Sequence, residues 1–382
     1  MKGFKRKIYT ALTIINRKIS PNSSSLKENI FKTSYNKNLL LSYITSPFLY
    51  KISNSHSNNY ECFSIATIFK NNKFNVDVID WNDAYYIPNK NYDAIIDIHS
   101  NLERLFPYLS NNSYKILHIT GAHWSFHNNA ELNRINNLFL RKGYSCIPRR
   151  QVPPSKGIDF ASHATTVGNS FTIETFGFSN KTINRIPISA GISRKWVPRL
   201  NMDKIKRNFI WFGGGGLVHK GLDLVLEAFI KMPYVNLTVI GPIRNEPDFL
   251  LQYNREINNS KNIRVLGWLN SENSKFSEIC NNSIGIIFPS CSEGGGGSAI
   301  TAMKTGLIPI VTRESSVDLD PFGLLLDKPS VNEIMEKVNI ILQLPNDTLQ
   351  MYSEKISTIT NLNYSESRFF DYYNQFVKNN IK

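Results

Sequence analysis

Two glycine-rich stretches of this sequence have residue types and spacings that could bind a ligand and take part in catalysis. The first, at 208–232, reads NFIWFGGGGLVHKGLDLVLEAFIKM and contains Lys220; the second, at 289–311, reads PSCSEGGGGSAITAMKTGLIPIV and contains Glu293. Glycines let a backbone approach a bulky anion closely, and free N–H groups at a helix start attract phosphate. A carboxylate beside such amides can accept hydrogen bonds from hydroxyl groups. The combination suits a ligand with both phosphate and hydroxyls, namely a sugar phosphate or a sugar nucleotide.

Ordinary structural roles are the alternatives for both stretches. The first lacks the G-x-x-x-x-G-K-[ST] spacing of a P-loop, and a tight strand-to-helix turn uses glycine without any ligand. The second could be a glycine-rich loop with one solvated glutamate. Because the two stretches follow corresponding strands of one half of the chain, a shared ligand site is the favoured interpretation.

Short apolar runs that alternate with helical stretches predict the elements that position these residues. Several runs are apolar on both faces, as in strands covered by helices on each side, and strand–helix alternation twice over predicts two doubly wound α/β units. Ligands of such sheets bind beyond the carboxyl ends of the strands, where both glycine stretches lie. Segment 186–200 is the predicted linker, and 366–380 is a helix expected to pack on a domain face. The expected strands are 39–45, 74–80, 92–98, 114–120, 163–168, 183–189, 208–213, 235–241, 262–267, 284–290, 307–312 and 323–327.

The net charge of +14 is concentrated in the first half of the chain. Residues 1–200 carry 26 Lys and Arg against 11 Asp and Glu, whereas residues 201–382 carry 18 against 19. A basic half indicates a face for anionic lipid, an anionic acceptor or nucleic acid, with an ordinary solvated lysine surface as the alternative. Nucleic acid is the weakest of these, since the sequence has no helix-turn-helix, zinc-finger or RNP-type signature.

The first twenty residues, MKGFKRKIYTALTIINRKIS, combine apolar residues at helical spacing with six Lys and Arg. This pattern is typical of a helix that lies in a membrane interface and is attracted to anionic headgroups; a disordered basic tail and a helix packed on the domain are the alternatives. The segment is a poor signal peptide, and no apolar run is long enough to span a membrane. The four cysteines lack C-x-x-C spacing, which fits reduced thiols and argues against structural zinc. We therefore expect a cytoplasmic protein, peripheral at the inner face of the plasma membrane.

The second half resembles a known family in the order and spacing of its motifs. FGGGGLVHKGLDLVLEAF, LTVIGP, VLGWLNSE and FPSCSEGGGGSAITAMKTGLIPIVT look like the segments of group 1 glycosyltransferases of family 4. The first half resembles the family more loosely, through YDAIIDIHS and KILHITGAHW. The resemblance implies the GT-B fold, an α/β protein with two doubly wound Rossmann-like domains facing across a cleft. The implied divisions are a basic amphipathic segment at 1–20, an acceptor-side domain at 21–190, a nucleotide-sugar-binding domain at 191–365, and a C-terminal helix at 366–382 that could pack back on the N-terminal domain.

By resemblance, three residues are the catalytic candidates. Lys220 would contact the donor diphosphate, and Glu293 would contact hydroxyls of the transferred sugar. His123 would approach the reacting sugar from the acceptor domain, with a purely structural histidine as the alternative. The further donor-binding candidates are Gly213, Gly214, Gly215, Gly216, Gly294, Gly295, Gly296, Gly297, Ser298 and Thr301, with Trp268 and Leu269 lining the base pocket. The acceptor-side candidates are His56, Asn58, Asn59, Tyr60, His99, Arg149 and Arg150.

Two positions depart from the family pattern. Relatives usually carry Arg a few residues before the Lys, as a second diphosphate clamp, where this chain has Gly215. The family's second acidic residue, which commonly grips the ribose hydroxyls, falls on Thr301, which offers a hydroxyl and no carboxylate. Each loss would cost about 1.5–3 kcal/mol, or roughly ten- to a hundredfold in affinity. Arg149, Arg150 or Arg244 could compensate.

The resemblance therefore implies a retaining glycosyltransferase that moves a sugar from a nucleotide-sugar donor to a carbohydrate or lipid-linked acceptor, and we expect a role in cell-surface polysaccharide or glycolipid assembly. We expect no cofactor and no metal, because Lys220 and the glycine amides would stabilise the departing diphosphate. The expected partners are the nucleotide sugar, the acceptor and an anionic membrane surface, and not nucleic acid. Two alternatives remain: a catalytically silent nucleotide-sugar-binding protein, motivated by Gly215 and Thr301, and a nucleic-acid binder that uses the basic half.

Overall fold

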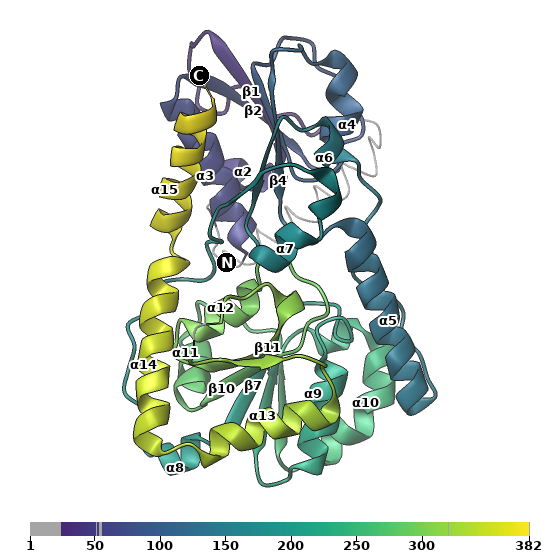
Figure 1. Ribbon diagram of the computed structural model, residues 1–382, viewed down its shortest axis with the longest axis vertical. Helices are drawn as coiled ribbons and strands as arrows, with labels where there is room; N and C mark the ends of the chain where they lie inside the picture. The colour runs from purple at the N-terminus through teal and green to yellow at the C-terminus, as the bar shows by residue number, and fades with distance from the viewer. Residues whose placement is uncertain (1–23, 51, 53–55, 320, 382) are drawn as a thin grey trace, which may run out of the picture.

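Short apolar segments form two parallel sheets, one in each of two stacked domains (Figure 1). The computed structural model describes residues 24–50, 52, 56–319 and 321–381. The predicted basic segment at 1–20 lies outside these residues. Each expected strand is present, and most are shorter than the apolar run that predicted them. The expected α/β fold class with two doubly wound, Rossmann-like domains is confirmed.

The N-terminal sheet has the strand order β2-β1-β3-β4-β5-β6, and all its strands are parallel. Its central residues, such as Leu39, Leu40 and Leu41, are fully buried because helices cover both faces. The chain leaves β1 for β2 and then returns to β3, so the switch point of this sheet lies between β1 and β3. The strands are β1 (Lys37–Tyr43), β2 (Phe74–Asp80), β3 (Ala94–Asp97), β4 (Tyr114–Ile119), β5 (His163–Thr166) and β6 (Ile183–Arg185). The helices are α2 (Ser46–Leu49), α3 (Ser57–Asn71), α4 (Asn101–Leu105), α5 (Trp124–Lys142), α6 (Gly157–Phe160) and α7 (Ser170–Glu174).

The C-terminal sheet has the order β12-β11-β10-β7-β8-β9 and is also parallel. The chain runs outward from β7 to β9 and returns to β10, which puts the switch point between β7 and β10. The strands are β7 (Asn208–Phe212), β8 (Asn236–Ile240), β9 (Ile263–Gly267), β10 (Gly285–Phe288), β11 (Ile308–Thr312) and β12 (Leu324–Leu326). The helices are α8 (Met202–Ile205), α9 (Leu222–Lys231), α10 (Pro247–Asn259), α11 (Ser274–Asn281), α12 (Gly297–Met303), α13 (Val331–Gln343), α14 (Asn346–Asn363) and α15 (Glu366–Asn380).

Two long helical segments connect the domains on opposite sides of the molecule (Figure 1). Helix α5 extends from the N-terminal domain along the C-terminal one, where Arg141 donates to Asp223 at 2.6 Å. Helix α14 continues into α15, which packs against α3; the Tyr60 hydroxyl donates to the Glu366 carbonyl at 3.1 Å. These contacts fix the arrangement of the cleft between the domains. Among the described helices, none is long and apolar enough to cross a membrane.

Candidate active site

A cleft of about 590 Å³ lies between the domains, at the carboxyl ends of both sheets. Both predicted glycine stretches contribute to its lining, because one follows β7 and the other follows β10, on either side of the switch point. The N-terminal domain contributes the segments after β1, β3 and β4. The cleft therefore lies where the two sheets present their ligand-binding ends to each other.

Lys220 and Glu293 form an ion pair in this cleft. Both side chains are largely buried, at 8% and 14% exposure, and Glu293 also accepts a hydrogen bond from Ser290 Oγ at 2.9 Å. Burial acts to raise the pKa of Glu293, but the neighbouring charges, Lys220 first, hold it at about 2. Glu293 is therefore ionised at neutral pH, and the cleft has a cation for phosphate beside an acceptor for hydroxyls.

The first glycine stretch is supported by a buried carboxylate that the sequence did not reveal. Glu246 accepts hydrogen bonds from the N–H groups of Gly216, at 2.5 Å, and Leu217, at 3.1 Å. These amides are not available to a phosphate, which corrects the expectation that Gly216 binds the donor. Gly213, Gly214 and Gly215 do line the cleft, so the loop offers the ligand a shorter stretch of backbone than expected.

The second glycine stretch, Gly294 to Gly297, lines the cleft and touches the N-terminal domain. A Cβ at Gly294 would lie 1.8 Å from the carbonyl oxygen of Thr120, so only glycine permits this approach. Gly296 has φ +59° and precedes α12, in a left-handed conformation that glycine adopts without strain. The spacing of glycines thus serves the contact between the domains as well as the cleft.

Thr301 lines the cleft, but its hydroxyl is already engaged. It donates to the carbonyl of Gly297 at 2.7 Å, one turn back in the same helix, and the side chain is 7% exposed. The missing carboxylate at this position is therefore not replaced by a free hydroxyl donor. Ser298, Trp268 and Leu269 also line the cleft, and Trp268 presents an open aromatic surface at 63% exposure.

Histidines from the N-terminal domain line the opposite wall. His123 precedes helix α5 with Nδ1 2.8 Å from Ser125 Oγ, and burial lowers its pKa, so the ring is neutral at pH 7. His56 accepts a hydrogen bond from the N–H of Asn58 at 3.2 Å, and burial, followed by the charges of two nearby cations, lowers its pKa. The ring of His99 packs against Trp81, and neither of its nitrogens has a partner among the described residues. His56, Asn58, His99 and His123 are all lining residues.

Three acceptor-side candidates do not lie in the cleft. The Tyr60 ring packs on Phe369 of α15, and Asn59 Nδ2 donates to the His56 carbonyl at 3.4 Å, because both residues follow the direction of α3 away from the opening. Arg149 is turned to the C-terminal domain, where it forms an ion pair of 2.5 Å with Asp248. Arg150, the next residue, does line the cleft.

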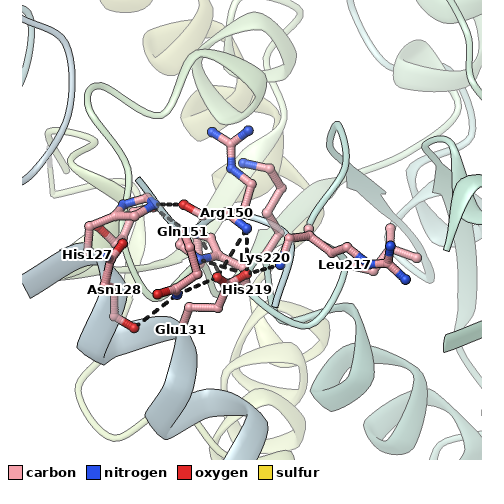
Figure 2. Close-up of polar contacts among 12 residues, drawn as sticks. His127, Asn128, Glu131, Arg150, Gln151, Leu217, His219 and Lys220 are labelled. Carbon is pink, nitrogen blue, oxygen red and sulfur yellow. Dashed lines mark hydrogen bonds and ion pairs between the residues drawn. The ribbon is translucent and has the colours of Figure 1, made fainter. Parts of the chain in front are cut away.

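Beneath the cleft is a buried polar network that the sequence analysis missed (Figure 2). His219 Nε2 lies 2.7 Å from the Ser292 carbonyl, and His127 Nε2 lies 2.7 Å from the Arg150 carbonyl. Burial lowers the pKa of both histidines, that of His219 to about 3, so each ring is neutral and donates from Nε2. His127 Nδ1 then accepts from the Ser292 hydroxyl at 2.9 Å. The network joins both glycine stretches to α5; the available sequence clue was that His123, His127 and Glu131 recur every fourth residue on one helix face.

Comparison with known proteins identifies the fold of the chain and the family of one part of it. No curated protein matches the chain in sequence. The chain is structurally similar to HepE of Anabaena, crystallised with UDP-glucose, with a TM-score of 0.56, 11% identity, and coverage of 90% of this chain and 99% of HepE. It is similar to sucrose-phosphate synthase of Thermosynechococcus elongatus with a TM-score of 0.56, 13% identity and the same coverage. Residues 201–357 match the family model of glycosyl transferases group 1. The group 1 resemblance seen in the sequence is thereby confirmed for residues 201–357, and the solved structures confirm the GT-B fold.

Proposed function

We propose that the chain is a retaining glycosyltransferase that transfers a sugar from a nucleotide-sugar donor to a carbohydrate or lipid-linked acceptor. The observation that supports this most is the ion pair of Lys220 with Glu293, which joins the two glycine stretches in the cleft. It provides a cation for a diphosphate and a carboxylate for sugar hydroxyls within one cleft.

In the proposed reaction, the bond between the anomeric carbon and the diphosphate oxygen breaks, and its electron pair stays on the diphosphate. The ammonium of Lys220 and the amides of Gly214 and Gly215 stabilise this negative charge. The acceptor hydroxyl attacks the same face of the sugar, and its proton passes to the departing diphosphate. His123, neutral at pH 7, is the proposed hydrogen-bonding partner of the reacting sugar. The route assigns no role to a metal ion or cofactor, because this chain's own groups supply the positive charge.

We propose a donor base and an acceptor class on separate grounds. HepE was crystallised with UDP-glucose, which makes UDP and its sugars the first nucleotides to test. An acceptor in cell-surface polysaccharide or glycolipid assembly would suit the basic first half of the chain. We also propose that residues 1–20 attach the chain to an anionic membrane. Deletion of these residues should abolish sedimentation with anionic liposomes, and unchanged sedimentation would contradict the attachment.

A catalytically silent nucleotide-sugar-binding protein is the second candidate. The engaged hydroxyl of Thr301 and the absence of a side chain at Gly215 favour it, because both remove grips on the nucleotide. Turnover distinguishes the two candidates.

The test is release of nucleoside diphosphate from a panel of nucleotide sugars, with and without simple glycosides as acceptors. We expect release by the wild type, loss of release in Lys220→Ala and Glu293→Gln, and unchanged release in Arg149→Ala. The anomeric configuration of the product, read by NMR, tests retention. Binding of the donor without any release would support the silent candidate.

A further inference from the structure

The backbone that carries Arg150 is fixed to helix α5 (Figure 2). Glu131 accepts hydrogen bonds from the N–H groups of Arg149 and Arg150, both at 2.9 Å, and also from Gln151 Nε2 at 2.7 Å. The carbonyl of Arg150 accepts from His127 Nε2 at 2.7 Å. Since donors and acceptors of the segment are both satisfied by α5, the origin of the Arg150 side chain is held in place.

From this origin, the side chain of Arg150 crosses to the C-terminal domain. It passes over Gly216, where an added Cβ would lie 2.5 Å from Cγ of Arg150 and 2.9 Å from Cδ. Gly216 has φ +83°, so glycine is required there by conformation as well as by space. Arg150 and Lys220 line the same cleft, and Figure 2 shows both side chains leaving the labelled cluster toward the same side. Two cations from two domains therefore face one space.

Of the described residues, two cations and two carboxylates line the cleft, but burial raises the pKa of one of these carboxylates, Glu61, to about 7, so it is only partly ionised at neutral pH. Lys220 is paired with Glu293. In the part of the chain that the structure describes, no carboxylate lies within ion-pair distance of the Arg150 guanidinium. Arg149, its neighbour in sequence, is instead neutralised by Asp248 outside the cleft. An arginine beside a second cation without a carboxylate of its own is suited to an anionic ligand.

We propose that Arg150 binds the diphosphate of the donor jointly with Lys220, so that the anion site is completed across the domain boundary. The inference rests on the proposed function, which assigns a diphosphate to this cleft. A guanidinium presents paired N–H donors that match two phosphate oxygens, whereas an ammonium acts as a point charge. The two groups would thus provide orientation and charge, respectively.

Arg150 and Lys220 come from different domains, so a ligand that binds both of them connects the domains. A diphosphate held by Arg150 and Lys220 ties the N-terminal domain to the C-terminal one, and it offsets the repulsion between the two cations. Without Arg150, the diphosphate would be held by the C-terminal domain alone.

The experiment is calorimetric titration of the full chain with UDP, GDP, ADP and dTDP, followed by the best-bound diphosphate and its nucleoside on variants. Arg150→Ala should weaken diphosphate binding roughly ten- to a hundredfold, the usual range for a charge-assisted hydrogen bond. The affinity for the nucleoside should not change, and Arg150→Lys should recover part of the loss. Arg149→Ala is the matched control and should bind as the wild type does. Circular dichroism and the melting temperature establish that each variant is folded.

Diphosphate affinity that is unchanged in Arg150→Ala but lost in Lys220→Ala would overturn the role of Arg150 and leave the proposed function intact. An equal loss of affinity for nucleoside and diphosphate would also overturn the role of Arg150, because a nucleoside has no phosphate for Arg150 to contact. If the wild type binds none of the diphosphates, the proposed function fails and this inference fails with it.

Discussion

Lys304, directly after helix α12, is a buried lysine whose surroundings predict an effect of pH on folding stability. It is 1% exposed, and its ammonium donates to the carbonyl of Gly191, in the predicted linker, at 3.2 Å. Burial lowers the pKa of Lys304 from 10.5 to about 8, with Glu366 opposing the shift and Arg194 adding to it. The folded chain therefore releases this proton at a lower pH than the unfolded chain does.

The sign and size of the effect follow from proton linkage. Between pH 8 and 10.5 the unfolded chain binds more protons at this residue, so the free energy of unfolding rises with pH in that window. The whole shift is equivalent to about 3 kcal/mol. About 2 kcal/mol of it falls between pH 7 and pH 9.5.

The perturbation is Lys304→Met, which keeps much of the side-chain volume and removes the titration. Urea unfolding of both proteins at pH 7 and pH 9.5 gives the stability difference between them at each pH. Other titrating groups cancel in this difference, which should move by about 2 kcal/mol in favour of the wild type at the higher pH. A difference that is the same at both pH values would refute the reasoning.

Three further predictions concern the cleft. Glu293→Gln removes the ion-pair partner of Lys220, so the nucleoside diphosphate should bind at least as tightly as it binds the wild type. The variant should also lose any preference for the nucleotide sugar over the diphosphate. Weaker diphosphate binding in calorimetry would contradict this. Gly294→Ala brings a Cβ to 1.8 Å from a main-chain carbonyl oxygen of the other domain and should lower the melting temperature by several degrees. Gly214→Ala, whose added Cβ would have no atom within 4 Å, should leave the melting temperature unchanged. Equal melting temperatures of the two variants would contradict the interdomain contact. Thr301→Val should leave diphosphate affinity unchanged, because that hydroxyl already donates to its own helix, and a tenfold loss in titration would show otherwise.

Much of the fold could be predicted from the sequence because its information is local. Runs such as 39–45 and 284–290 are apolar on both faces, which is the pattern expected of strands covered by helices on both sides of a sheet. The glycines after Phe212 and after Glu293 likewise marked the strand ends at which the cleft is found. Periodicity and turn residues act over a few positions and can be read directly.

The remainder of the site depends on contacts between distant segments. Glu246 occupies the amides of Gly216 and Leu217 from a segment about thirty residues away, and nothing in the spacing of the glycines indicates it. Arg150 reaches Gly216 from the other domain. Because the sequence does not show this contact, Gly215 could be interpreted there only as the loss of an arginine. Arg149 and Arg150 are adjacent, and the sequence alone does not distinguish them. In the structure Arg149 forms an ion pair with Asp248, whereas Arg150 lines the cleft.

The central claim, that Lys220 and Glu293 form a donor site, is tested most directly by thermal unfolding with a panel of nucleoside diphosphates and nucleotide sugars. A ligand at about a hundred times its Kd adds about 2.7 kcal/mol of stability, which raises the melting temperature by several degrees. We predict such a rise for the nucleotides of one base in the wild type and its loss in Lys220→Ala. No rise with any nucleotide, or the same rise in both proteins, would contradict the assignment of the donor site to this pair.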